Sequence, residues 1–210
     1  MYGRGEVLRV ALAATKMPFE SVDISEPEWA VKKLDKKNYP SGGLPMLVTP
    51  DGCRMGETMP TARFIGIKGG VYPTDPEECW ACDSLMDCAT DIHNASGAML
   101  GPIMSGDAAQ IEPAVATYCA TLDNFLKVMN GRLEGHGKKF LVKDTWTPAD
   151  FAWATVWFNF VCNPICPPLV CGPIKACFEK YPKVHAWAQC MAECMKDYLT
   201  ERHATRPCPI

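Results

Sequence analysis

The sequence lacks any continuous run of about 20 apolar residues, the length that a membrane-spanning helix needs. Its first ten residues, MYGRGEVLRV, also lack the apolar core of a secretory signal. A strong excess of charge is missing as well, since the net charge is only -3. Such a chain has no long-range attraction to phosphate backbones or anionic lipid. We therefore expect a cytoplasmic protein that has neither nucleic acid nor a membrane as a partner.

Internal repeats, low-complexity tracts and the paired CxxC motifs of zinc sites are absent too. The 12 cysteines are many, but disulfide scaffolds are usually short, and this chain of 210 residues is 48% hydrophobic and has ample material for a core. We interpret most of the cysteines as buried thiols and predict no metal or cofactor. Zinc stays a less favoured alternative for four irregularly spaced cysteines, Cys162, Cys166, Cys171 and Cys177.

Hydrophobic spacing in the first third of the chain predicts a short series of elements. Apolar residues at helical spacing indicate a helix over 6–15, and the segment 19–24 is compatible with a strand, followed by a loop or short helix. Two short apolar stretches flank Pro50-Asp51-Gly52, which predicts a β-hairpin. Helical spacing resumes over 58–67 and ends at Gly69-Gly70. The expected order is α, β, hairpin, α.

Strand-like alternation stops at a short link over 71–75, and helical patterns continue from there. Long helices are predicted over 79–93 and 111–130. Thr147-Pro148-Ala149-Asp150 combines an N-cap, a first-turn proline and a capping-box acid, and the apolar sequence after it predicts a buried helix. One last amphipathic helix is predicted from a stripe through Val184, Trp187, Met191, Met195 and Tyr198.

Several motifs follow one another in a specific order along nearly the whole chain. They are Arg4-Gly5-Glu6 with Arg9, Leu44-Pro45-Met46, Glu57-Thr58, Arg63-Phe64-Ile65, WTPADF, YPKVHAW and YLTER. This ordered set resembles the cytosolic glutathione transferases. The resemblance implies an α/β, thioredoxin-like domain over 1–70, a linker over 71–75 and an all-helical bundle domain over 76–210.

The resemblance also implies a function. Members of this family conjugate the glutathione thiolate to apolar electrophiles in detoxification, with glutathione as co-substrate, and are homodimers. Trp29 and Lys33, together with Asp83, Asp87 and Asp91 of the next domain, look most like the sigma class, which includes prostaglandin D synthases and the S-crystallins of cephalopods. The electrophile should bind in an apolar pocket between the domains, lined by long helices of the second domain and by a 96–106 loop.

Glutathione carries two carboxylates, an amine and a thiol, and the resemblance supplies candidates for each. A cis bond before Pro45 would let the Leu44 backbone pair with the cysteinyl residue. Lys33 and Trp29 would contact the glycyl carboxylate, although a surface lysine and a packing tryptophan are the commoner explanation for either residue alone.

Three further residues are candidates for the other end of glutathione. Thr58, at a predicted helix start, offers its hydroxyl and free backbone N–H groups to the γ-glutamyl carboxylate, or it is a simple N-cap. Glu57 stands where the family usually has Gln and would accept from the ligand's ammonium. Asp91 resembles an acid that reaches the glutathione amine across a dimer interface, and a solvated helix charge is an equal alternative.

Catalysis needs a group that stabilises the thiolate, and Arg4 at a helix start is suited to this. The family's catalytic Tyr would lie upstream of Met1, and Tyr2 is the nearest hydroxyl at a different spacing. The family's first strand would also lie upstream of Met1. Backbone groups that lose their hydrogen-bond partners in a sheet cost about 1–3 kcal/mol each when buried. We therefore expect the natural protein to begin some ten or more residues earlier.

Two competing functions remain. Cys79-Trp80-Ala81-Cys82 is a CxxC of the redox type, but it lies in the predicted helical domain, which favours a packing role. A non-catalytic, crystallin-like binding or structural protein is the stronger alternative. The absent Tyr, Glu57 in place of Gln and the load of 11 Met and 12 Cys favour it.

Overall fold

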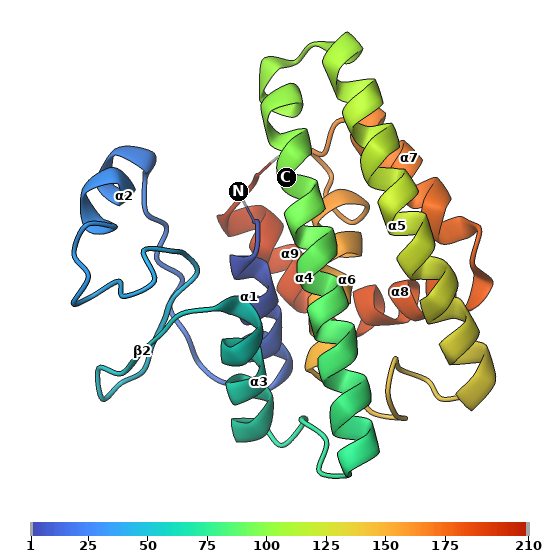
Figure 1. Cartoon of the computed structure of the whole chain (residues 1–210), viewed down its shortest axis with the longest axis horizontal. Coiled ribbons are helices and arrows are strands. Elements are labelled where there is room, and N and C mark those ends of the chain that lie inside the picture. Colours follow the sequence, from blue (N-terminus) through green and yellow to red (C-terminus); the bar gives the residue numbers. More distant parts are fainter. Residues whose placement is uncertain (1, 209–210) are drawn as a thin grey trace.

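The computed structural model describes residues 2–208, which form a small N-terminal part and a larger helical body (Figure 1). In the N-terminal part, α1 (Gly5–Ala14) packs against α3 (Thr58–Lys68). Helix α2 (Glu26–Lys32) and the hairpin of β1 (Leu47–Val48) and β2 (Arg54–Met55) lie to one side of them. No helix of residues 2–208 is long and apolar enough to cross a membrane. The fold is the predicted combination of a small α/β part and a helical bundle.

The predicted hairpin is present, although each of its strands has only two residues. Leu47 pairs with Met55 and Val48 with Arg54 in an antiparallel register. Gly52 in the turn has φ +86°, a conformation that a residue without Cβ adopts at little cost. The peptide bond between Leu44 and Pro45, just before β1, is cis. The hairpin and the cis bond both agree with the sequence-based expectation.

The predicted strand over 19–24 is not formed. This segment is extended, but the two-stranded sheet of residues 2–208 contains only β1 and β2 and gives it no partner. A strand satisfies its backbone groups through a neighbour, so an extended segment without a neighbour stays irregular. Together with α2 and the hairpin, this segment forms what we call the α2 lobe (residues 18–57). Helix α2 buries none of its residues.

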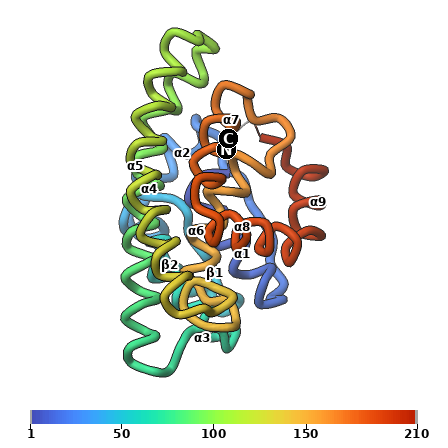
Figure 2. Tube along the Cα trace, turned by 90° about the vertical axis from the view of Figure 1, so that its right-hand side faces the viewer, coloured from blue at the N-terminus to red at the C-terminus, as the bar shows by residue number. Residues whose placement is uncertain are grey.

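The helical body begins with two long antiparallel helices, α4 (Pro76–Ser105) and α5 (Ala108–His136). They are followed by α6 (Pro148–Phe160), α7 (Pro168–Glu179), α8 (Pro182–Cys194) and α9 (Lys196–Thr205). Figure 2 shows α4 and α5 at one side of the molecule, with α6 and α8 behind them and α9 at the opposite side. Between α3 and α4, Asp83 accepts hydrogen bonds from Arg63 (2.6 Å) and Tyr72 (3.0 Å), which tie the two parts together.

Helix α6 is the centre of the core, and all 13 of its residues are buried. The predicted capping box is formed, because the Asp150 carboxylate accepts from the Thr147 backbone N–H and also from the Thr147 hydroxyl. Helix α3 approaches this first turn closely at Gly66, where a Cβ would lie 2.4 Å from Pro148. The WTPADF sequence therefore begins a helix, α6, against which both the N-terminal part and the rest of the helical body pack.

Two helix predictions were wrong in their extent. The expected 96–106 loop is helical up to Ser105, because Gly97, Gly101 and Pro102 are accommodated within the last turns of α4. The expected single last helix is broken at Met195, where φ -106° and ψ 16° end α8 and α9 begins in a new direction. The apolar stripe continues across this break, since Met195 and Leu199 are both buried. A stripe with helical spacing does not by itself show that one helix carries it.

Candidate functional site

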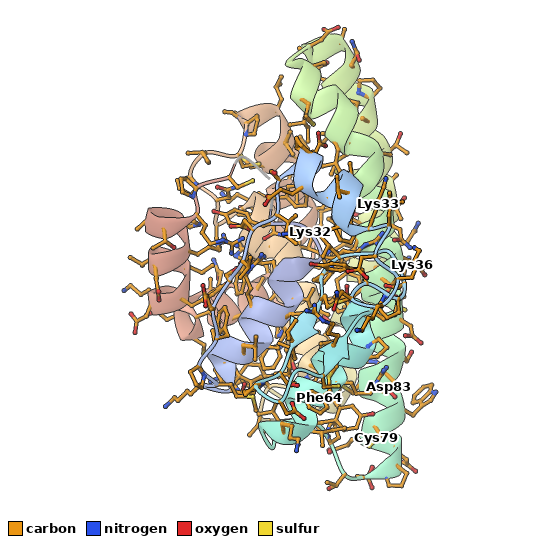
Figure 3. All side chains as sticks on the ribbon, turned by 90° about the vertical axis from the view of Figure 1, so that its left-hand side faces the viewer. Lys32, Lys33, Lys36, Phe64, Cys79 and Asp83 are labelled. Atoms are coloured by element: carbon orange, nitrogen blue, oxygen red, sulfur yellow. The ribbon has the colours of Figure 1, made fainter. Side chains whose placement is uncertain are left out.

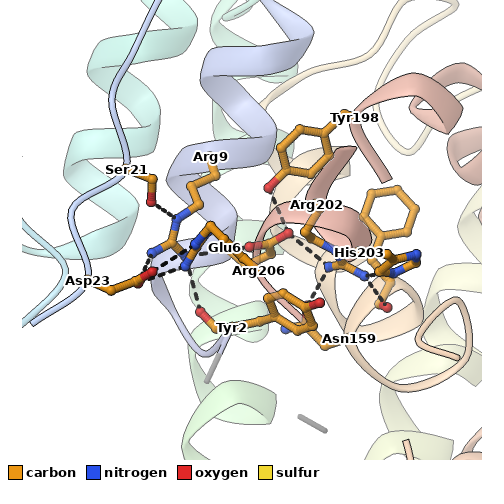
Figure 4. A network of polar contacts seen from close by, with 11 residues as sticks. Tyr2, Glu6, Arg9, Ser21, Asp23, Asn159, Tyr198, Arg202, His203 and Arg206 are labelled. Carbon is orange, nitrogen blue, oxygen red and sulfur yellow. Dashed lines mark hydrogen bonds and ion pairs between the residues drawn. The ribbon is translucent and has the colours of Figure 1, made fainter. Parts of the chain in front are cut away.

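The start of α1 is fixed by a buried polar network that joins it to α9 (Figure 4). Glu6 is fully buried and accepts hydrogen bonds from Arg202 (2.8 Å) and Tyr198 (2.7 Å) of α9. The Arg9 guanidinium lies 3.5 Å from the other Glu6 oxygen and donates to Ser21 at 2.8 Å. Burial and the neighbouring Glu6 raise the pKa of Tyr198. The predicted Glu6 and Arg9 motif therefore acts as a structural clamp on the first turn of α1.

A second ion pair extends this network to the α2 lobe. Arg206 donates two hydrogen bonds to Asp23, at 2.8 and 2.9 Å, and Arg9 lies 3.5 Å from the same carboxylate. The bonds from Arg206 hold the pKa of Asp23 below its usual range. The extended segment 19–24 is thus tied to the C-terminal part of the chain by side chains rather than by a sheet.

Tyr2, the candidate catalytic hydroxyl, belongs to this network. Its ring lies under the Arg202 guanidinium, 4.0 Å from ring centroid to guanidinium carbon, and only 2% of the residue is exposed. The hydroxyl oxygen itself is buried. Burial raises the pKa of Tyr2, and the charge of Arg202 opposes this. A buried hydroxyl with a raised pKa is poorly suited to stabilise a thiolate in solvent-accessible space.

A small apolar pocket lies directly beside the start of α1. Its volume is about 140 Å³, close to the roughly 150 Å³ of an apolar cavity that holds benzene. Four segments line it: the turn before α1, the C-terminal half of α4, α5 and the end of α6. The lining residues are Gly3, Arg4, His93, Ser96, Gly97, Met99, Leu100, Ile103, Tyr118, Val156, Asn159 and Phe160. The 96–106 segment therefore lines a pocket, as predicted, but from a helix.

Arg4 is the charged residue at the mouth of this small pocket. It is the N-cap of α1, and its guanidinium donates a hydrogen bond to the Asn94 side chain of α4. Asp91 lies one turn before Asn94 on α4 and is exposed, so the two are on similar sides of the helix. The helix start and the guanidinium together give this region positive potential, which favours an anionic ligand.

The small pocket also contains polar groups that are held neutral or unpaired. The Tyr118 residue is 2% exposed, and its hydroxyl makes no hydrogen bond within residues 2–208. Burial raises its pKa. His93 Nε2 lies 3.3 Å from the Ala152 carbonyl oxygen and 3.1 Å from the Thr155 hydroxyl. Burial lowers the pKa of His93 to about 4, so the imidazole is neutral at pH 7.

The low pKa of His93 predicts acid sensitivity. The unfolded chain binds a proton near the ordinary value of 6.5, whereas the folded chain resists it until about 4. The free energy of unfolding should therefore fall by roughly 2–3 kcal/mol as the pH is lowered from above 6.5 toward 4. Urea unfolding of the wild type and of His93→Gln at several pH values measures it. Parallel profiles for the two proteins would contradict the assignment.

A larger groove separates α1 from the α2 lobe. Its volume is about 1150 Å³, and it is lined by residues 2–5 and by parts of 17–24 and 44–50, among others. Leu44 and Pro45 lie in its wall, as does Arg4, which lines both cavities. Tyr2 borders the groove as well, so four of the predicted site residues border one continuous space. Lys32 and Tyr39 of the lobe line the groove as well.

Trp29 and Lys33 do not line either cavity. The Trp29 ring packs edge-on against Tyr39, with centroids 5.2 Å apart, and Lys33 is the exposed C-cap of α2. The two residues were expected in a loop or short helix, and a capping box at Ser25 starts a short helix there. Figure 3 shows Lys32, Lys33 and Lys36 on this lobe.

Glu57 and Thr58 lie at the start of α3, beside the loop that contains Pro45. Glu57 is the N-cap, and its φ of +61° is a left-handed value that is uncommon for a residue with a side chain. Such strained positions cluster at ligand-binding sites. A Cβ on the neighbouring Gly56 would lie 3.3 Å from the Ser41 hydroxyl, so the two loops are in contact. Glu57, Thr58 and Asp91 are absent from the lining of both cavities.

Known proteins share both the sequence and the fold of this chain. Residues 93–194 match the family model "Glutathione S-transferase, C-terminal domain". "Glutathione S-transferase 4" of Caenorhabditis elegans is 28% identical over 206 residues, which cover 94% of this chain and 90% of that protein. Residues 93–194 therefore resemble the C-terminal domain of glutathione S-transferases, and the chain as a whole is similar to these proteins.

Two further similarities are informative about this chain. S-crystallin SL18 of Nototodarus sloanii is 28% identical over 111 residues, 49% of this chain and 35% of that protein. This match agrees with the predicted likeness to the sigma class. The crystal structure of a monomeric glutathione S-transferase from the hookworm Necator americanus superposes with a TM-score of 0.78 at 24% identity, covering 99% of this chain and 94% of that one.

The CxxC motif of this glutathione S-transferase relative has no redox geometry. The Cys79 thiol donates to the Pro73 carbonyl oxygen at 3.2 Å, while Cys82 is fully buried on α4. Burial raises the pKa of Cys82 to about 11, so its thiolate is scarce at neutral pH. Within residues 2–208, no three His, Cys, Asp or Glu side chains gather as a metal site.

Sequence reasoning missed the residues that only tertiary packing brings to the site. His93 and Tyr118 reach the small pocket from α4 and α5, far along the chain from Arg4, and Asn94 of α4 accepts a hydrogen bond from Arg4. Lys32, next to the predicted Lys33, is the lysine that lines the groove. The helical spacing of Trp29 from Lys32 was visible in the sequence, but the direction of the helix was not.

Proposed function

We propose that this protein binds glutathione in the groove and transfers its thiolate to compact apolar electrophiles in the small pocket, as a cytoplasmic homodimer active in detoxification. The observation that carries the proposal is the position of Arg4, which borders both the groove and the pocket. A thiolate formed beside the guanidinium would lie next to the space for its electrophile. Similarity to glutathione S-transferases supports the choice of glutathione.

The residues around the groove suit the binding of glutathione there. Leu44, before the cis bond, would pair with the peptide backbone of glutathione, and the basic residues of the α2 lobe would attract its glycyl carboxylate. Trp29 and Lys33 remain candidates for that end. The start of α3, with Glu57 and Thr58, would hold the γ-glutamyl group, and Asp91 its amine.

The volume of the small pocket limits the size of the electrophile. A volume of about 140 Å³ suits a group of roughly one aromatic ring. Most of the lining is apolar, whereas the Tyr118 hydroxyl has no partner within residues 2–208. We infer that Tyr118 donates a hydrogen bond to a polar atom of the substrate, because the residue lines the pocket and its hydroxyl is free to donate there.

A non-catalytic binding protein is the second candidate, and the burial of Tyr2 favours it. With this hydroxyl under Arg202, no tyrosine hydroxyl from the start of α1 faces the small pocket in the described residues. The likeness to an S-crystallin agrees with this alternative. Binding without turnover would be its signature.

The two candidates are separated by one pair of measurements. We expect retention on immobilised glutathione and measurable conjugation of a chlorinated nitrobenzene, with turnover lowered about 10-fold or more in Arg4→Ala, since one positioned charge stabilises an anion by about 1.5–3 kcal/mol. Lys127→Ala is the control, because Lys127 is exposed on α5 and lines neither cavity. Retention without conjugation supports the binding protein, and loss of both contradicts both candidates. Light scattering measures the assembly state.

A further inference from the structure

Helices α5 and α7 pack side by side and bring two cysteines together (Figure 1). Cys119 and Cys177 are 58 positions apart in the sequence, yet the Cys177 thiol lies 3.9 Å from the Cys119 carbonyl oxygen. The two side chains are close enough for each to shift the pKa of the other. This is a tertiary contact between two nucleophilic groups, outside the proposed glutathione site.

A neighbouring ion pair fixes the register of this contact. Asp123 lies one turn after Cys119 on α5, and Lys180 lies one turn after Cys177, at the end of α7. The Lys180 ammonium is 3.0 Å from the Asp123 carboxylate. Two cross-helix contacts in successive turns hold the two thiols at the same level of the helix pair.

We propose that Cys119 and Cys177 form an oxidisable dithiol site, which hydrogen peroxide or another small hydroperoxide converts to a disulfide. The Cys177 thiolate attacks the peroxide oxygen, which gives a sulfenic acid and releases hydroxide. The Cys119 thiol then attacks the sulfenic sulfur, the S–S bond forms and water leaves. Two thiols lose two hydrogens in total, and one peroxide is reduced to two waters.

The surroundings of Cys177 favour its thiolate. The hydrogen bond from Cys119 lowers the pKa of Cys177 to about 7, with help from the charge of Lys180 and against the effect of burial. The titratable groups around it are Cys119, Tyr118 and Asp123 from α5 and Lys180 and Tyr181 beyond α7. Because reaction with peroxide requires the thiolate, this environment makes Cys177 the cysteine that we expect to react.

Other thiols in the core are less reactive by the same criterion. Burial raises the pKa of Cys82 and Cys162 to about 11 and that of Cys166 to about 12. Access favours a small oxidant, because Cys177 is 5% exposed and Cys119 is half-buried. A peroxide molecule has the size of about two waters and can reach such a site, whereas a bulky disulfide cannot approach it as easily.

The test is to oxidise the fully reduced, folded protein with low concentrations of hydrogen peroxide. After digestion without a reductant, mass spectrometry should find the Cys119–Cys177 cross-link as the first disulfide, with a mass loss of two hydrogens. Its rate of formation should rise several-fold from pH 6 to pH 8, as the Cys177 thiol ionises. A first disulfide between other residues, such as Cys190 and Cys194 of α8, or a rate independent of pH would overturn the proposal.

Single-residue variants distinguish the roles of the two thiols. In Cys119→Ser the second step is blocked, so a dimedone probe should label Cys177 as its sulfenic acid, whereas the wild type should not accumulate the label. Cys190→Ser is the matched control and should leave the Cys119–Cys177 cross-link unchanged. Absence of Cys177 labelling in a folded Cys119→Ser protein would also contradict the proposal. The wild-type mapping needs no variant and decides the question if Cys119→Ser does not fold.

Discussion

Replacing Glu6 by Ala is expected to lower the free energy of unfolding by about 3–5 kcal/mol, because it leaves Arg202 buried without its counter-charge. Glu6 is fully buried and Arg202 is 3% exposed, so water cannot replace the lost partner. The Tyr198 hydroxyl loses its acceptor as well. The melting temperature should fall by roughly 6–20 °C, since each kcal/mol corresponds to about 2–4 °C in a chain of this size.

A solvent-exposed ion pair provides the control for Glu6→Ala. Lys175 and Glu179 of α7 are 3.1 Å apart, and their side chains are 54% and 46% exposed. Glu179→Ala should cost no more than about 0.5 kcal/mol. Chemical unfolding of both variants measures the difference, and equal losses would show that burial of the Glu6 pair is not the cause.

A double variant tests the reason for the effect. If the unpaired charge is the main cost, replacing Arg202 by Leu in the Glu6→Ala background should restore part of the lost stability. A double variant that is less stable than Glu6→Ala alone would instead show that Arg202 contributes mainly through its bonds to Asn159 and to the Phe158 carbonyl oxygen. Because this network fixes the first turn of α1, it also fixes the position of Arg4.

Local signals in the sequence were sufficient where the physical cause is local. Thr147 and Asp150 cap α6 as predicted, Gly69 ends α3, and Gly52 forms the hairpin turn. Each of these depends on the conformation or hydrogen bonding of a few neighbouring residues. Such preferences survive in almost any tertiary context.

Predictions that depend on distant partners were less successful. The segment 19–24 has the composition of a strand, but a strand exists only with a neighbour. Gly97, Gly101 and Pro102 suggested a loop, yet packing of α4 along α5 keeps that segment helical. Tertiary contacts outweigh propensities of about 1 kcal/mol per glycine.

The site was predicted unevenly for the same reason. Arg4, Leu44 and Pro45 belong to short motifs, and the structure places all three on the groove. Tyr118 and His93 occupy single positions within long helices, and their neighbours in sequence give no sign of a pocket. Only the crossing of α4, α5 and α6 shows that these side chains share one space with Arg4.

Replacing Asp150 by Ala is expected to have the largest effect on stability of any single substitution considered, because four donors converge on its carboxylate. The Leu141 backbone N–H and the Trp187 indole N–H donate to one oxygen, each at 2.9 Å. The Thr147 backbone N–H and hydroxyl donate to the other, at 2.8 and 3.0 Å. Each buried donor without an acceptor costs about 1–3 kcal/mol, so we expect a loss of at least about 4 kcal/mol.

Such a loss is a large part of the roughly 5–15 kcal/mol that a folded domain has in total, so Asp150→Ala should be largely unfolded or insoluble at 37 °C. Asp75 of α4 is the matched control, since it also caps a helix, accepting from two backbone N–H groups at 3.0 Å, but is exposed. Asp75→Ala should cost only about 0.5–2 kcal/mol. Similar losses for the two variants, measured by thermal unfolding, would show that capping alone explains Asp150.

Asp150→Asn distinguishes the pattern of hydrogen bonds from the size of the side chain. The carboxamide has the same shape but keeps one acceptor oxygen and turns an NH₂ group toward two of the four donors. We therefore expect Asn to lose most of the stability that Ala loses, even though no cavity is formed. Burial raises the pKa of Asp150, while the four donated hydrogen bonds oppose this rise. The same hydrogen bonds hold together α6, α8 and the loop at Leu141. A stable Asp150→Asn protein would mean that packing around the carboxylate, rather than its acceptors, joins these three segments.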